Sequence, residues 1–256
     1  MATLSELDGV RLDALARQLA DAHRQPAHTV PAAAFAGLSV EDAMAIQHRT
    51  LALLAERALV TKVGIDAGGR GIAAPIYASL AGPDGTSLAL PARGVLGIEV
   101  EIAVRLAATI TPEMAAAGEA AVLPAIASYH VGVEIVGSRF DDRAVAGANG
   151  QLADNLNTAG YVWSESPWSR GLDLADVRID VEVDGKRFWQ GPGANPFGSI
   201  LAPVIAYARA RLDSFGALDA GMLVTTGSLC GLVAINRPCT IRAGIAGSAP
   251  VTLSFR

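Results

Sequence analysis

The chain has little of several features that would point to common classes of protein. It contains two cysteines, Cys230 and Cys239, in 256 residues. Two cysteines allow at most one disulfide and make neither a disulfide framework nor a zinc site, so we expect them to be small core residues. The 20 Lys and Arg residues form no cluster, and the formal net charge is -5. Because nucleic-acid binding requires a basic surface, we expect no nucleic-acid partner.

Long apolar runs are also missing. No segment reaches the ~18 uninterrupted apolar residues that a membrane-spanning helix needs. The first eight residues lack the basic and apolar regions of a signal peptide. We therefore expect a soluble, cytoplasmic protein with no membrane partner. The sequence is 51% hydrophobic but only 5% aromatic, which is consistent with extra apolar surface buried in an oligomer interface.

The N-terminal part of the chain predicts helices. One apolar stripe recurs at helical spacing within residues 10–23. Ser39 and Asp42 resemble a capping box, which would open a second helix that runs to about Arg57. The length of the chain is sufficient for one large core. We therefore expect a helical subdomain over residues 1–60 and a further unit over residues 61–256.

The second unit is predicted to be strand-rich, with two embedded helices, which makes the fold class α+β. Residues 177–189 predict a hairpin with Asp184-Gly185 at its turn. Asn195-Pro196 resembles an N-cap followed by proline at the first helical position, which would open a helix to about Leu212. The other helix has Pro112 near its first turn. Further strands are predicted at 61–65, 95–105, 131–137, 222–226, 233–236, 240–245 and 251–255, with a glycine-rich loop at 68–71.

Two glutamates on one predicted strand are the most informative feature. Side chains alternate along a strand, so Glu99 and Glu101 share one face, and the apolar Ile98 and Val100 share the other. A second predicted strand carries Glu134 among apolar residues. Three such carboxylates suit a hard divalent cation such as Mg²⁺. The alternative is a solvated strand face, and spacing alone does not bring Glu134 to the other two.

An ordered set of short motifs resembles one family. The set is Lys62-Val63-Gly64, Gly97 to Ala103, Glu134 to Arg139, Ala153-Asp154-Asn155, Gly191 to Pro196 and Gly227-Ser228-Leu229. It is similar to the 2-keto-4-pentenoate hydratase / 4-oxalocrotonate decarboxylase family of the fumarylacetoacetate hydrolase superfamily. The resemblance covers nearly the whole chain. It implies a fumarylacetoacetate-hydrolase-like mixed β-roll as the catalytic domain over residues 61–256, with the helical subdomain before it.

The resemblance also implies a site. Glu99, Glu101 and Glu134 would hold Mg²⁺ (or Mn²⁺), on which a small 2-oxo acid substrate chelates. Lys62 would neutralise an enolate or act as an acid or base. Ser228 and the pair Asp154-Asn155 would contact the substrate, although a turn serine and a loop cap are the plain alternatives.

The chain departs from the family pattern beside the lysine. Family members carry an Asp two residues before a Pro, and Ala73 stands at that position before Pro75. We expect Asp66 to replace this carboxylate, or the enzyme to need fewer proton transfers or to act on a different 2-oxo acid. The expected activity is that of a hydro-lyase or carboxy-lyase in aromatic-compound catabolism.

Four functions stay open at this point. The first is hydration of 2-hydroxypenta-2,4-dienoate, and the second is decarboxylation of a 2-oxo-enedioate. Carbon–carbon hydrolysis of an acylpyruvate is the third. The fourth is a non-catalytic subunit that associates with a related pathway enzyme. The resemblance also implies a homo-oligomer.

Overall fold

The centre of the fold is a long antiparallel pair of strands. The computed structural model describes residues 9–210, 212 and 215–256, and it pairs β5 (Gly97–Leu106) with β6 (Ile126–Val136) over nearly their whole length. Ile98 and Val100 on β5 are fully buried, as the alternation of apolar residues requires. Because β-branched side chains pack well on a pleated surface, one face of the β5–β6 pair forms part of the hydrophobic core.

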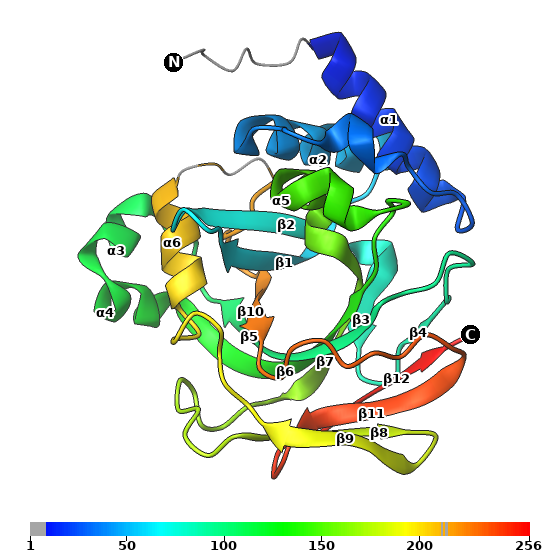
Figure 1. The fold of residues 1–256 in the computed structure, drawn as a ribbon. Coiled ribbons are helices and arrows are strands. Elements are labelled where there is room, and N and C mark those ends of the chain that lie inside the picture. Colours follow the sequence, from blue (N-terminus) through cyan, green and yellow to red (C-terminus); the bar gives the residue numbers. More distant parts are fainter. Residues whose placement is uncertain (1–8, 211, 213–214) are drawn as a thin grey trace.

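The two strands lie in a curved sheet of seven strands (Figure 1). Its order is β2-β1-β10-β5-β6-β7-β3. The β1–β10 and β3–β7 pairs are parallel and the others are antiparallel, so the sheet is mixed, as predicted. The remaining bounds are β1 (Ala58–Ile65), β2 (Gly71–Tyr77), β3 (Ala81–Pro83), β7 (Thr158–Pro167) and β10 (Leu223–Ser228).

A second sheet of five strands lies below the first in Figure 1. Its order is β4-β12-β11-β8-β9. The predicted hairpin is confirmed, because Val183 pairs with Lys186 across the Asp184-Gly185 turn. The predicted last two strands are also present. The bounds are β4 (Ser87–Leu88), β8 (Arg178–Val183), β9 (Lys186–Pro192), β11 (Cys239–Ile245) and β12 (Val251–Phe255).

Helices cover one side of the large sheet (Figure 1). The capping box at Ser39 and Asp42 is confirmed, since each side chain hydrogen-bonds the other residue's backbone N–H. The helix that it opens ends at Leu54, because Ala55 adopts a left-handed conformation with φ 53°. The bounds are α1 (Gly9–Arg24), α2 (Val40–Leu54), α3 (Pro112–Ala117), α4 (Glu119–Val122), α5 (Arg143–Ala153) and α6 (Ala202–Ala210).

The N-terminal helices share a core with the sheets. The buried stripe of α1, which includes Leu12 and Leu19, belongs to the same apolar cluster as Ile98 of β5 and Ile241 of β11. The chain changes from helix to strand between Leu54 and Ala58, and the division into two units at residue 60 stays a prediction. Residues 1–8 lie outside the described part. None of the helices in that part has the length and apolar character that crossing a bilayer demands.

Two local predictions are wrong, and several elements were not predicted. Asn195 opens a tight turn, in which its Oδ1 accepts a hydrogen bond from the Phe197 N–H at 2.9 Å, and helix α6 begins only at Ala202. The helix is described as far as Ala210, and Arg211, which the predicted helix included, lies outside the described residues. The predicted strand at 233–236 is reduced to a single bridge between Ile98 and Val233. Helix α5 and the strands β2 and β7 were not predicted.

Candidate functional site

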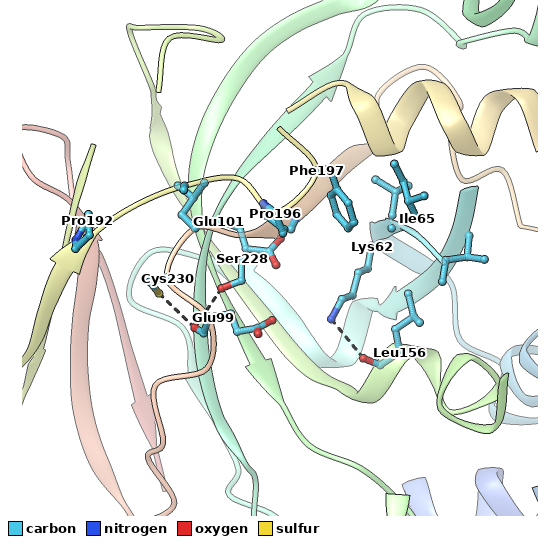
Figure 2. Close-up of a pocket in the computed structure, with 17 residues that line it drawn as sticks. Lys62, Ile65, Glu99, Glu101, Leu156, Pro192, Pro196, Phe197, Ser228 and Cys230 are labelled. Atoms are coloured by element: carbon cyan, nitrogen blue, oxygen red, sulfur yellow. Dashed lines mark hydrogen bonds between the residues drawn. The ribbon is translucent and has the colours of Figure 1, made fainter. Parts of the chain in front are cut away.

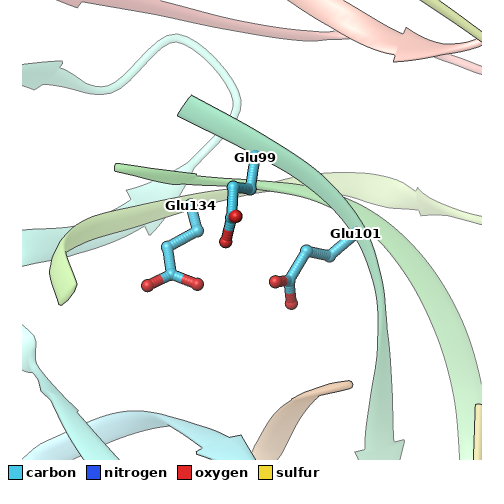
Figure 3. Close-up of side chains that lie close together, drawn as sticks. All are labelled: Glu99, Glu101 and Glu134. Carbon is cyan, nitrogen blue, oxygen red and sulfur yellow. The ribbon is translucent and has the colours of Figure 1, made fainter. Parts of the chain in front are cut away.

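The three predicted glutamates lie close together on one face of the large sheet, on strands β5 and β6 (Figure 3). Glu99 pairs directly with Glu134 across the β5–β6 ladder, and Glu101 lies on the same face two residues further along. One carboxylate oxygen from each residue lies within 4.8 Å of the other two. The pairing register therefore brings together residues that are far apart in the sequence.

Two of the three glutamates are buried, and Glu99 is partly buried. Glu101 and Glu134 are 0% exposed, so the solvated-face alternative fails for both. Oε1 of Glu101 and Oε2 of Glu134 have no hydrogen-bond partner among the described residues. Buried carboxylate oxygens without partners are unfavourable unless a cation or proton meets them.

The residues fit a divalent cation. Mg²⁺ and Mn²⁺ prefer oxygen ligands, and Mg²⁺ holds each at ~2.1 Å, so carboxylate oxygens this close together can share one ion after small side-chain rotations. Burial raises the pKa of Glu101, and it raises that of Glu134 to about 8. The attraction of Lys62 lowers both pKa values without cancelling the effect of burial. A cation would supply the missing compensation.

A small polar network holds Glu101 in place. The Thr225 hydroxyl donates to Oε2 of Glu101, and the Gly227 N–H donates to the same oxygen at 3.2 Å. The hydroxyls of Thr225 and Tyr161 are hydrogen-bonded at 3.0 Å. Tyr161 reaches this position because Gly132 has no side chain, as a Cβ there would lie 2.0 Å from the phenol oxygen. These contacts fix one carboxylate oxygen and leave Oε1 for a ligand.

Lys62 of β1 faces the glutamates. Its Nζ donates to Oε1 of Glu134 at 2.7 Å and to the Leu156 carbonyl at 3.3 Å. Burial lowers the pKa of Lys62, but the attraction of the three glutamates outweighs burial, and the net shift is upward. Without a metal ion, Lys62 is therefore an ammonium at neutral pH rather than a base with a depressed pKa.

The cluster opens into a cavity of about 720 Å³ (Figure 2). Lys62, Glu99 and Glu101 line it, and so does Ser228, whose Oγ donates to the Gly231 carbonyl at 3.1 Å. Ser228 is thus placed where a substrate contact is predicted. Most of the remaining wall is apolar.

Asp66 lies outside the cavity wall. Its Oδ1 accepts hydrogen bonds from the backbone N–H groups of Gly68 and Arg70, both at 2.9 Å. Asp66 therefore stabilises the turn of the β1–β2 hairpin, as Asp commonly does in turns. A catalytic role for Asp66 does not fit this structure, and the predicted glycine loop is this tight turn.

Position 73 does not face the cavity either. Lys62 pairs with Ala74, and Val63 pairs with Ala73. Paired residues in a ladder point to the same face, so Ala73 points away from Lys62. A carboxylate at this position would be directed into the core, where Ala73 is fully buried.

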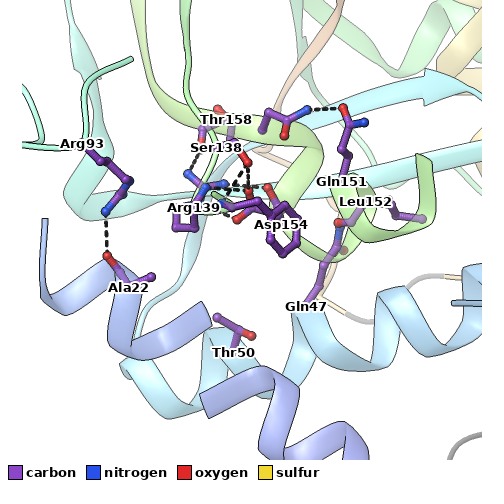
Figure 4. Close-up of polar contacts among 12 residues, drawn as sticks. Ala22, Gln47, Thr50, Arg93, Ser138, Arg139, Gln151, Leu152, Asp154 and Thr158 are labelled. Atoms are coloured by element: carbon purple, nitrogen blue, oxygen red, sulfur yellow. Dashed lines mark hydrogen bonds and ion pairs between the residues drawn. The ribbon is translucent and has the colours of Figure 1, made fainter. Parts of the chain in front are cut away.

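Asp154 has a structural role (Figure 4). Its Oδ1 accepts from Nε of Arg139 at 2.5 Å, and its Oδ2 accepts from Ser138 Oγ and the Arg139 N–H, both at 2.9 Å. Asp154 is 1% exposed. Because both oxygens are occupied, substrate binding by Asp154 does not fit. Asn155 is also buried outside the cavity wall, but the segment it begins carries the Leu156 carbonyl to Lys62.

Sequence reasoning missed three contributors. Thr225 and Tyr161 hold Glu101, and Phe197 forms part of the cavity wall. Isolated hydroxyl and aromatic residues carry no local pattern. The only available signal was the glycine at 132, whose lack of a side chain admits the Tyr161 phenol.

Metal binding is expected to depend on pH. In the metal-free protein the pKa of Glu134 is raised from 4.5 to about 8. Between pH 4.5 and pH 8, the Glu134 carboxyl therefore keeps its proton in the folded state and loses it in the unfolded chain. The stability that this proton contributes is lost as pH rises through about 8. Mg²⁺ must displace it, so affinity should rise with pH up to about 8 and then level off. Titration calorimetry in two buffers should detect at least one proton released at pH 6.5, because the pKa of Glu101 is raised as well. Affinity that does not change with pH would contradict this prediction.

Comparisons with known proteins identify relatives with assigned activities. No family model matches the chain. A 2-keto-4-pentenoate hydratase from Burkholderia vietnamiensis is 30% identical over 182 residues, which cover 70% of this chain and 68% of the relative. A 4-oxalocrotonate decarboxylase from a Pseudomonas species is 27% identical over 151 residues, covering 59% of this chain and 55% of the relative. The chain spans about half the length of the first curated relatives that it matches.

Solved structures share the fold. The structure of 4-oxalocrotonate decarboxylase from Pseudomonas putida, complexed with magnesium and adipate, has a TM-score of 0.78 at 21% identity and covers 98% of this chain and 99% of that one. A putative fumarylacetoacetate hydrolase family protein from Yersinia pestis has a TM-score of 0.52 at 18% identity, covering 77% of this chain and 92% of its own. The structures share the fold, and the relative from Burkholderia vietnamiensis shows that the chain belongs to the 2-keto-4-pentenoate hydratase / 4-oxalocrotonate decarboxylase family.

Proposed function

We propose that this protein is a divalent-metal-dependent lyase that hydrates 2-hydroxypenta-2,4-dienoate, or a close analogue, to a 4-hydroxy-2-oxo acid. The observation that carries the proposal is the buried cluster of Glu99, Glu101 and Glu134 beside Lys62 at the bottom of a cavity. A Mg²⁺ or Mn²⁺ ion held by the three glutamates would supply Lewis-acid stabilisation of the 2-oxo group.

The chain's own residues account for the rest of the proposed chemistry. Lys62 is charged and is held by Glu134 and the Leu156 carbonyl. A charged Nζ here can donate a proton to the substrate or neutralise negative charge that develops on it. Ser228 offers a hydroxyl on the cavity wall for orientation. The cavity of about 720 Å³ has room for the water that hydration adds, and the apolar remainder of the wall limits further water around the reacting atoms.

The alternatives have less support. A 2-oxo-enedioate has a second carboxylate, and Lys62 is the one cationic residue among the described residues that line the cavity. Carbon–carbon hydrolysis needs a positioned base for water. His130 of β6 is not such a base, because it is buried with its ring nitrogens 2.8 Å from the Ser164 carbonyl and Ser128 Oγ and does not line the cavity. A homo-oligomer, a non-catalytic role beside a related enzyme and a cytoplasmic location stay predictions.

Turnover of chemically generated 2-hydroxypenta-2,4-dienoate tests the proposal. The ultraviolet absorbance of the dienol should disappear with Mg²⁺ present and persist with EDTA. A 2-oxo-enedioate should be assayed in parallel for release of carbon dioxide. Metal-dependent decarboxylation without hydration would replace the proposed reaction by the second candidate. No turnover of either compound by the purified chain would favour the partner-subunit role.

A further inference from the structure

Most of the cavity wall is apolar, and it extends well beyond the glutamates. Figure 2 shows Phe197 and Ile65 on the Lys62 side of the cavity, with Pro192 and Cys230 beyond Glu99 in the same view. The volume of about 720 Å³ falls in the ~300–1,000 Å³ range of sites that enclose drug-sized ligands. A five-carbon acid bound at the glutamates would leave much of this space, and most of this apolar surface, without contact.

Phe197 is held in the wall by specific contacts. The Asn195 side chain donates to the Thr226 carbonyl at 3.1 Å and accepts from the Phe197 N–H at 2.9 Å. The Ala194 N–H donates to the Leu229 carbonyl at 2.8 Å. The loop that carries Phe197 is therefore tied to strand β10 and to the residue that follows it.

Glycines make room for the Phe197 ring. Gly227 has φ 107°, a conformation that favours glycine, and a Cβ there would lie 2.9 Å from the ring. A Cβ on Gly64 would lie 3.8 Å from the same ring and 3.7 Å from Ile72. The ring thus lies over the backbone of the two strands, β1 and β10, that border the site.

The described part of the wall offers no second cation to a distant negative charge. Lys62 is its one cationic side chain, and it is already paired with Glu134. Glu99 and Glu101, the acidic residues of the wall, would repel a carboxylate. A second carboxylate on the substrate would lose water and gain no partner against Phe197 and Ile72, which is costly.

We propose that the substrate is a monocarboxylic acid with an apolar substituent at the end distant from the carboxylate, and that Phe197 determines preference for this tail. This inference rests on the proposed function, since it places the 2-oxo acid end at the three glutamates. The class comprises 2-hydroxy-2,4-dienoates with an alkyl or aryl tail of several carbons.

Direct binding of unreactive 2-oxo acids in the presence of Mg²⁺ tests this inference without turnover. Calorimetry would compare 2-oxopentanoate, 2-oxooctanoate and 2-oxosuberate, the last being an eight-carbon diacid. Each buried methylene strengthens binding by up to about fourfold. We expect 2-oxooctanoate to bind at least tenfold more tightly than 2-oxopentanoate, and at least tenfold more tightly than 2-oxosuberate.

Substitutions at Phe197 test whether this residue contacts the apolar end of the bound 2-oxo acid. Phe197→Ala should weaken binding of 2-oxooctanoate about fivefold or more and change that of 2-oxopentanoate by less than about twofold. Phe197→Leu, which keeps apolar bulk, should lie between the two. Phe188→Ala is the matched control, because Phe188 is 53% exposed on strand β9 and does not line the cavity.

The outcomes separate this inference from the proposed function. If 2-oxopentanoate binds with Mg²⁺ but 2-oxooctanoate binds no more tightly, or 2-oxosuberate binds equally well, the inference is overturned and the metal-dependent site stands. An unchanged length preference in Phe197→Ala overturns the role of Phe197. If none of the 2-oxo acids binds with Mg²⁺, the proposed function and the inference fall together.

Discussion

Replacing Glu101 by glutamine is expected to abolish both metal binding and turnover. Glutamine keeps the shape of the side chain and an oxygen to accept from Thr225 and Gly227, which now donate to Oε2 of Glu101. The change removes the charge that a divalent cation needs from a fully buried ligand. Lewis-acid stabilisation is worth several kcal/mol, so kcat/KM should fall about a thousandfold or more.

The same variant should remain folded. Burial raises the pKa of Glu101, so the neutral amide avoids the cost of a buried charge, and the melting temperature without metal should not fall. Addition of Mg²⁺ should then stabilise the parent and leave the variant unchanged. Saturation at ~100 times the dissociation constant adds ~2.7 kcal/mol to a protein that binds the ion only when folded.

Glu165→Gln is the matched control. Glu165 also lies on a strand of the large sheet, but its side chain is exposed. It should keep both turnover and the response to Mg²⁺. A Glu101→Gln protein that is folded, stabilised by Mg²⁺ and active would show that the glutamate cluster does not hold a catalytic metal.

Part of the site could be predicted because strand alternation is a local rule. Glu99 and Glu101 had to share a face once residues 97–104 were recognised as a strand. That Glu134 lies directly opposite Glu99 is a matter of register, which spacing alone does not determine. The resemblance to a family, rather than any physical pattern, placed Glu134 in the cluster.

Elements that depend on tertiary contacts escaped prediction. Helix α5 contains Gly147 and Gly150, which weaken helix propensity. Gly147 has the non-helical angles φ 69° and ψ -177°, so α5 consists of two short helical segments joined at a kink. A Cβ on Gly150 would lie 3.2 Å from the Phe35 carbonyl oxygen, so close packing favours a glycine there. Strand β2 contains Pro75, which would interrupt a central strand but is tolerated because β2 is the edge of its sheet.

Polar residues were the least predictable. Asn195-Pro196 satisfies the sequence rule for a helix start, yet the Asn195 side chain is used to tie its loop to the Thr226 carbonyl. Asp154 looked like a residue for substrate and instead pairs with Arg139. One short polar side chain can cap a helix, close a turn or pair with a distant charge, and only the fold decides among these uses.

Replacing Asp154 by alanine is expected to destabilise the whole protein. Arg139 is 1% exposed, and besides Asp154 Oδ1 it donates to the carbonyl oxygens of Thr158 and Asp154 at 2.5 and 2.6 Å. Removing the carboxylate leaves a buried guanidinium without its counter-ion. Breaking a buried pair in this way costs about 3–5 kcal/mol. Denaturant unfolding should show a lower midpoint with little change in slope.

Two further variants separate charge from packing. Asp154→Asn keeps a hydrogen-bond acceptor for Arg139 and should cost less than the alanine change. Asp21→Asn removes an exposed ion pair with Arg24, 3.4 Å long, and should change stability by no more than roughly 1 kcal/mol.

The Arg139–Asp154 pair fixes the segment that presents the Leu156 carbonyl to Lys62. Under conditions where Asp154→Asn is folded, its turnover should therefore fall while Mg²⁺ affinity is kept. Loss of neither stability nor activity would show that this pair is dispensable for positioning Lys62.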